Sequence, residues 1–101
     1  AHPFRNNDTV YVDSLHGLEV VNCNPRHKSR NELALRLAQA HPNLFRTCGS
    51  DAHQIEDEAR AAVLFEGEIH DSFDIRDGIL RRQTRLWCPE QTDLITQSES
   101  F

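Results

Sequence analysis

A strand–helix–strand pattern places the strongest constraint on the fold of this chain. Residues 18–22 form a β-branched apolar run and residues 44–48 a second mixed apolar run, and both predict strands. Between them, residues 29–40 have the apolar spacing of an amphipathic helix, which His41-Pro42 ends. A helix that joins two consecutive strands implies a parallel pair with a right-handed crossover. The sequence therefore predicts an α/β fold built from βαβ units.

The start of this helix carries a capping signal. Ser29 and Glu32 stand in the S-x-x-E relation of a capping box, which predicts Ser29 as the N-cap. The apolar face of the helix is expected to comprise Leu33, Leu37 and Ala40, flanked by Ala34 and Ala38.

The rest of the chain has weaker signals. Periodicity does not decide between a short strand and a helical turn for residues 9–12, or between strand and helix for residues 61–65. We expect a short helix or turn at residues 55–60. Ser72 can cap a helix to about Arg82, whose apolar side would be Phe73, Ile75, Ile79 and Leu80. Leu86-Trp87 either adds a final strand or packs on the core. Residues 1–88 are thus expected to form the folded part, and the polar residues 89–101 a tail that is mobile unless a neighbour pins it.

Composition restricts the class of protein. A chain of 101 residues has room for one small domain, and its mean hydropathy of -0.63 is low for a self-sufficient core. The net charge of -5 argues against nucleic acid as the partner. The sequence contains no apolar run near 18 residues, so it predicts no membrane span.

The three cysteines are widely spaced and form no Cys-x-x-Cys pair, which argues against a zinc ribbon. Cys48 has the opposite strand parity from Asp51, so we expect it to be a buried neutral thiol. Three free thiols, Cys23, Cys48 and Cys88, without a secretory signal favour a reducing, cytoplasmic location.

Candidate functional residues follow the second predicted strand, in the segment Gly49-Ser50-Asp51-Ala52-His53. A strand projects residues i and i+2 to the same face, so we expect Asp51 and His53 to point the same way from its end, with the carboxylate beside the imidazole. Such donors at a strand end make a plausible half-site for a metal ion. The chain opens with a second such piece, Ala1-His2-Pro3-Phe4-Arg5.

The order of these pieces, Ala-His-Pro, the strand at Gly17–Asn22 and then Gly-Ser-Asp-Ala-His, resembles the C-terminal part of the PHP family. This family is the polymerase and histidinol phosphatase domain of metal-dependent phosphoesterases. The similarity covers about residues 1–82, and the stretch from Gly49 onward also resembles the module called PHP-associated. The resemblance implies the C-terminal part of a distorted (β/α)7-type barrel.

It also implies a chemistry. His2, Asp51 and His53 would be ligands of a cluster of two or three divalent metal ions (Zn, Mn or Fe), and a phosphate ester would be hydrolysed through metal-activated water. The preferred substrate is a small phosphorylated metabolite or nucleotide.

The chain lacks the His-x-His motif of the family, and it contains no methionine from which its own translation could start. We therefore expect it to be the last part of a longer enzyme, with the remaining ligands supplied by a missing N-terminal part or a second copy of the chain. The alternative is a non-catalytic PHP-associated module that completes or regulates another polypeptide.

Further residues are candidates for supporting roles. Glu19 lies in a predicted buried strand, where a carboxylate needs a partner; it would orient a metal-bound histidine from the second shell or cap an arginine. Arg5, close to His2, and the cluster of Arg26, His27 and Lys28 are candidates for binding a substrate phosphate. A solvated loop is the alternative for that cluster.

Overall fold

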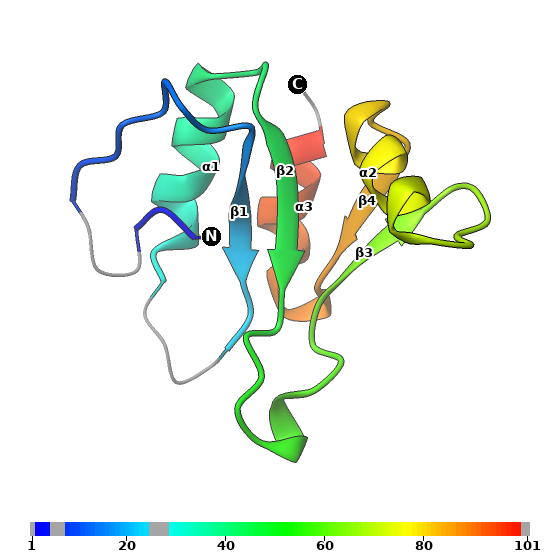
Figure 1. The fold of residues 1–101 in the computed structure, drawn as a ribbon. Helices are drawn as coiled ribbons and strands as arrows, with labels where there is room; N and C mark the ends of the chain where they lie inside the picture. The colour runs from blue at the N-terminus through cyan, green and yellow to red at the C-terminus, as the bar shows by residue number, and fades with distance from the viewer. Residues whose placement is uncertain (1, 5–7, 25–28, 100–101) are drawn as a thin grey trace.

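A computed structural model of the protein describes residues 2–4, 8–24 and 29–99 and shows a mixed α/β fold (Figure 1). The elements are, in chain order, β1 (Gly17–Asn22), α1 (Asn31–Ala40), β2 (Phe45–Gly49), the 3-10 turn η1 (Ile55–Asp57), β3 (Ala62–Phe65), α2 (Ser72–Leu80), β4 (Thr84–Trp87), the 3-10 turn η2 (Pro89–Gln91) and α3 (Thr92–Glu99). β1 and β2 pair in parallel, and β3 and β4 pair antiparallel. The described residues form these two small sheets and no closed barrel, so the α/β class is confirmed and the barrel stays a prediction.

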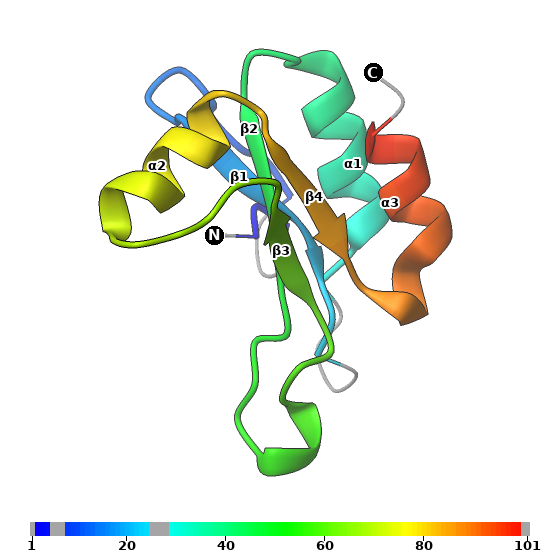
Figure 2. The same cartoon turned by 90° about the vertical axis from the view of Figure 1, so that its right-hand side faces the viewer.

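The predicted βαβ unit is present as β1, α1 and β2. Its register places Gly17 opposite Phe45 and Asn22 opposite Gly49, so both strands end at the same edge of the sheet. α1 and α3 cover one side of the parallel sheet and α2 lies on the other side (Figure 2). The core fills the α1 and α3 side and contains Leu18, Val20, Val21, Leu35, Ala38, Leu44, Cys48 and Ile95.

The predicted capping box of α1 is wrong. The N-cap is Arg30, which has a left-handed backbone with φ 52° and makes no side-chain cap. The buried Oγ of Ser29 makes no hydrogen bond with any described residue. The Arg30 side chain instead reaches back along the chain, where it donates to the carbonyl of Phe4 and to Asp8. These contacts tie the N-terminal segment to the first turn of the helix.

The buried face of α1 also differs from the expected one. Its buried residues are Asn31, Ala34, Leu35 and Ala38, whereas Leu33 and Leu37 are only half-buried and Ala40 is exposed. Apolar residues lie on both the expected and the observed face of this helix, so the sequence pattern alone predicts only a broad apolar stripe. The packing against β1 decides which part of that stripe is buried.

α2 begins at Ser72 as expected, but its N-cap is Asp71, whose Oδ1 accepts from the backbone N–H of Asp74. Gly78 allows the helix to approach β3 closely, since a Cβ there would lie 2.6 Å from Cδ1 of Phe65. The expected apolar side of α2 is mostly not buried. The exposed fraction is 62% for Phe73, 42% for Ile75 and 50% for Leu80.

Residues 89–99, in the stretch expected to be a tail, form η2 and α3. Residues 92–99 form α3, which packs beside α1, and Ile95 is only 6% exposed. In the described part of the chain, α3 and the other helices are too short or too polar to cross a bilayer.

The prediction of three free thiols is wrong, because Cys23 and Cys88 form a disulfide between the ends of β1 and β4. This pairing removes the argument from free thiols for a reducing location. Cys48 is the buried free thiol that strand parity predicts.

Candidate functional site

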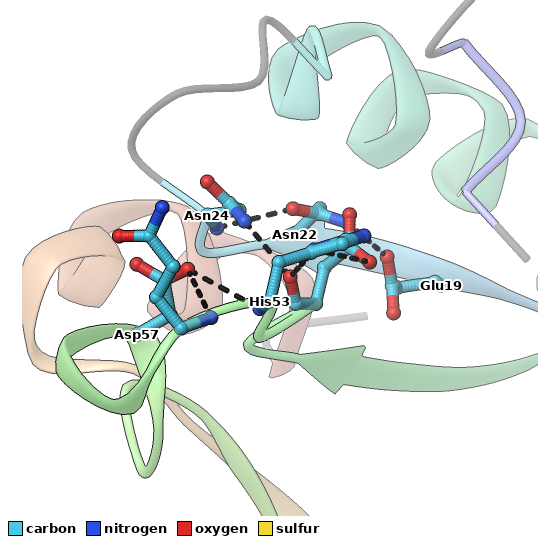
Figure 3. A network of polar contacts seen from close by, with 7 residues as sticks. Glu19, Asn22, Asn24, His53 and Asp57 are labelled. Carbon is cyan, nitrogen blue, oxygen red and sulfur yellow. Dashed lines mark hydrogen bonds and ion pairs between the residues drawn. The ribbon is translucent and has the colours of Figure 1, made fainter.

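A network of polar side chains lies where β1 and β2 end (Figure 3). It joins β1 to the loop that follows β2 and to η1. Its members are Glu19, Asn22, Asn24, Asp51, His53, Gln54 and Asp57. The parallel pairing explains the location, because two parallel strands bring their carboxyl ends to one edge of the sheet.

Asn22 is the centre of this network. Its Nδ2 donates to Oε1 of Glu19 at 3.0 Å and to Oδ2 of Asp51 at 3.2 Å. Its Oδ1 accepts from the backbone N–H of Asn24 at 3.1 Å. A carboxylate of β1 and one of the loop after β2 therefore meet at one amide group.

Asp51 and His53 lie close together, but not for the reason that strand parity gave. β2 ends at Gly49 and Asp51 has φ 51°, so the alternation of an extended strand does not reach His53. A turn brings the two residues together instead, with His53 Nδ1 4.0 Å from Asp51 Oδ1. The carbonyl oxygen of Asp51 accepts a hydrogen bond from Asn24 Nδ2 at 2.8 Å. The same oxygen lies 2.8 Å from His53 Nδ1.

The contact with this carbonyl fixes the tautomer of His53. A carbonyl oxygen only accepts, so the Nδ1 atom of the ring must carry the proton. The neutral ring then has its lone pair on Nε2, which is the usual state of a histidine that binds a metal. The His53 side chain is 59% exposed and that of Asp51 27%, so both are accessible from outside the core.

The loop that carries His53 is anchored by Asp57. This residue is fully buried, and its Oδ2 accepts from the backbone N–H groups of His53 and Gln54. The anchor holds the turn in place without using the imidazole.

Among the described residues, His2 is joined to the network through Asn31. Its Nε2 lies 2.9 Å from Asn31 Oδ1, and its Nδ1 accepts from the backbone N–H of Phe4. Asn31 Oδ1 also accepts from the backbone N–H of Asn22. Burial lowers the pKa of His2, which agrees with a neutral ring that carries its proton on Nε2. Both ring nitrogens are thus engaged in hydrogen bonds.

Among the described residues, Glu19 accepts a hydrogen bond from the side-chain amide of Asn22. Burial raises its pKa, the hydrogen bond from Asn22 lowers it, and the nearby charge of Asp51 raises it further. Gly49 makes room for this side chain, because a Cβ at that position would lie 3.0 Å from Glu19 Oε2.

Sequence reasoning missed the asparagines and Asp57. Asn22, Asn24 and Asn31 have no motif spacing that distinguishes them from turn and cap residues, so only the folded arrangement reveals them. The predicted phosphate-binding residues Arg5, Arg26 and His27 lie outside the described residues, and their role stays a prediction.

Asp51 and His53 are the described side chains that could contribute to a metal site, with a carboxylate and an imidazole after the end of β2. Across residues 2–4, 8–24 and 29–99, however, no group of three or more His, Cys, Asp or Glu side chains could hold a metal ion. A complete centre therefore needs donors beyond those described.

Comparison with known proteins gives one match. A family model described as PHP-associated matches residues 28–84, which is more than half of the chain and includes α1, β2, Asp51, His53 and α2. No curated protein and no solved structure matches the chain significantly.

Proposed function

Because the chain belongs to the PHP-associated family, we propose that it packs against a PHP domain, on the same or another polypeptide, and completes its phosphoesterase site. The observation that carries this proposal is the position of Asp51 and His53 just after the C-terminal end of β2. An apolar groove near the starts of β1 and β2 is the proposed docking surface. The two steps, docking and completion of the site, are argued separately below.

The groove lies between α2 and the side of the parallel sheet that α1 leaves open. Its volume is about 540 Å³, and its lining residues are His16, Gly17, Leu18, Phe45, Thr47, Arg76, Ile79 and Leu80. Phe73 and Ile75 extend the apolar surface along α2. A contiguous apolar surface of this kind on a small domain is typical of an interface. A PHP domain seated here would bury the side of α2 that the chain itself leaves exposed.

Completion of the site is assigned to Asp51 and His53. The turn after β2 presents the carboxylate, and the contact of His53 Nδ1 with the Asp51 carbonyl leaves Nε2 as the ring nitrogen that would bind a metal. A divalent ion (Zn, Mn or Fe) bound there would lower the pKa of water and offset charge on the phosphoryl oxygens of a substrate. A small phosphorylated metabolite or nucleotide is the substrate class that we propose.

His2 and Glu19 have supporting places in this proposal. For His2 to serve as a ligand, one of its hydrogen bonds to Asn31 or Phe4 must break when the PHP domain docks. Glu19 acts through Asn22 on Asp51 rather than directly on a histidine ring.

A non-catalytic module that stabilises or regulates its partner is the second candidate. The engaged ring nitrogens of His2 favour it, as does the incomplete donor set of the described residues. Both candidates predict docking, and they differ in whether metal uptake depends on Asp51.

The test combines the chain with a PHP domain and measures complex formation by gel filtration and bound metal by elemental analysis. Asp51→Asn is expected to keep the complex and lose bound metal. The matched control Asp13→Asn, which changes an exposed aspartate, should retain both. Equal metal content in the two variants would favour the non-catalytic module, and failure of the unmodified chain to bind the PHP domain would refute the docking step.

A further inference from the structure

We propose that Asn22 is a positioning residue, which holds the carboxylates of Glu19 and Asp51 side by side at the edge of the sheet. This inference rests on the function proposed above, because it assigns the group that aims the Asp51 carboxylate. It goes further by naming a residue that neither the sequence motifs nor the family match singles out.

The hydrogen bonds of Asn22 leave one orientation for its amide. A side-chain amide has one accepting oxygen and two N–H donors. Nδ2 donates to Glu19 Oε1 and to Asp51 Oδ2, and Oδ1 accepts from the N–H of Asn24 (Figure 3). A flipped amide would turn its oxygen toward two carboxylates and its N–H groups toward another donor. Only the observed orientation matches every donor with an acceptor.

The backbone that carries this amide is held on both sides. The N–H of Asn22 donates to Asn31 Oδ1 at 2.9 Å, and Asn31 Nδ2 donates to the carbonyl of Asn22 at 3.1 Å. The next residue, Cys23, donates its N–H to Gly49 in the neighbouring strand at 2.9 Å. Asn22 and Asn31 are both buried, at 7% and 9% exposure. The amide therefore acts from a fixed point of the sheet.

The Asn22 amide is needed to keep the two carboxylates together, because of their charges. Neighbouring carboxylates repel each other when both are ionised. The two N–H dipoles of Asn22 lie against both groups and offset this repulsion, so Glu19 and Asp51 stay together. Without the donors, we expect the carboxylates to separate and the aim of Asp51 to change.

The first experiment measures Mn²⁺ affinity by calorimetry on the complex of the full chain with a PHP domain. Asn22→Leu keeps a similar side-chain volume and removes both donors. Since groups that orient a ligand typically contribute a factor of about 10–100 to metal affinity, we expect Mn²⁺ binding to weaken by that factor. The control Asn43→Leu, at an exposed asparagine, should bind as the unmodified chain does. Unchanged affinity in a folded Asn22→Leu complex would overturn the proposal.

A second measurement needs no substitution and holds even if Asn22→Leu fails to fold. In NMR spectra of the unmodified chain, the side-chain amide protons of Asn22 should exchange with solvent much more slowly than those of exposed Asn43. Equal exchange rates would overturn the proposal. If the unmodified complex takes up no Mn²⁺, the proposed function fails, and the exchange rates alone then decide whether Asn22 holds the pair.

Discussion

The reactivity of the Cys48 thiol is set by its buried position. It is 8% exposed and lies between the two sheets, where it donates to the carbonyl of Ala62 at 3.1 Å. Its Sγ is also 3.7 Å from the carbonyl of Trp87. Burial raises the pKa of Cys48, because a thiolate would lose its hydration there. Since the thiolate is the nucleophile, this cysteine should react poorly in the folded protein.

Alkylation by iodoacetamide tests this expectation. Without reductant, Cys48 should be modified far more slowly in native buffer than in urea, and mass spectrometry should find one modified thiol in the denatured chain. Because the pKa is raised, the thiolate fraction at a given pH is lower in the folded state. The midpoint of the pH–rate profile should therefore lie above that of the denatured chain. A midpoint at or below the denatured value would contradict the burial of Cys48.

Some residues of the candidate site could be predicted from the sequence. Asp51 and His53 were expected together from strand parity, and they do lie together, but a turn with a positive φ at Asp51 is the cause. The asparagines that organise them were not predictable. An asparagine amide acquires a role only when folding brings two carboxylates to it, as it does at Asn22.

At the scale of elements, the two long helices before β4 begin in different ways. α2 has a side-chain cap, because Asp71 Oδ1 accepts from the N–H of Asp74 at 3.0 Å. α1 has none, although Ser29 and Glu32 have the spacing of a capping box. The backbone of Arg30 takes the N-cap position, and its side chain is committed to Phe4 and Asp8.

Two alanine substitutions compare these helix starts. Asp71→Ala removes a real cap and should lower the free energy of unfolding by about 1 kcal/mol. Ser29→Ala removes a hydroxyl that makes no hydrogen bond with the described residues, so we expect it to be neutral or slightly stabilising. Urea denaturation of both variants gives the comparison. A loss at Ser29 as large as that at Asp71 would show that Ser29 caps α1 after all.

The elements themselves were largely predictable. β1, α1 and β2 have strong periodicity and clear end signals, and they form within one or two residues of the expected bounds. Helix faces were less predictable, because apolar residues surround much of α1 and one side of α2 packs against nothing described. α3 was not expected as an element, since its residues are mostly polar. Ile95 and Leu94 pack against the core and explain why the helix is held.

At the scale of the whole molecule, one covalent bond joins the two sheets. Cys23 follows β1 and Cys88 follows β4, at a sequence separation of 65, and both are buried. The sequence could not reveal this pair, because the two cysteines come together only when β4 docks near the end of β1. The bond also lies beside Asn22, so it connects the candidate site to the second sheet.

This connection should contribute strongly to the stability of so small a domain. A disulfide that closes a long loop typically adds about 2–4 kcal/mol, mainly by restricting the unfolded chain. For a domain of this size 1 kcal/mol corresponds to about 4–8 °C in Tm, so reduction should lower Tm by at least about 8 °C. Calorimetry with and without dithiothreitol measures the shift, and mass spectrometry confirms that both thiols are free. The double variant Cys23→Ala/Cys88→Ala serves as the control, since its Tm should be low and insensitive to dithiothreitol. A reduced chain that melts at the same temperature as the oxidised one would show that packing between the sheets, rather than the disulfide, holds the molecule together.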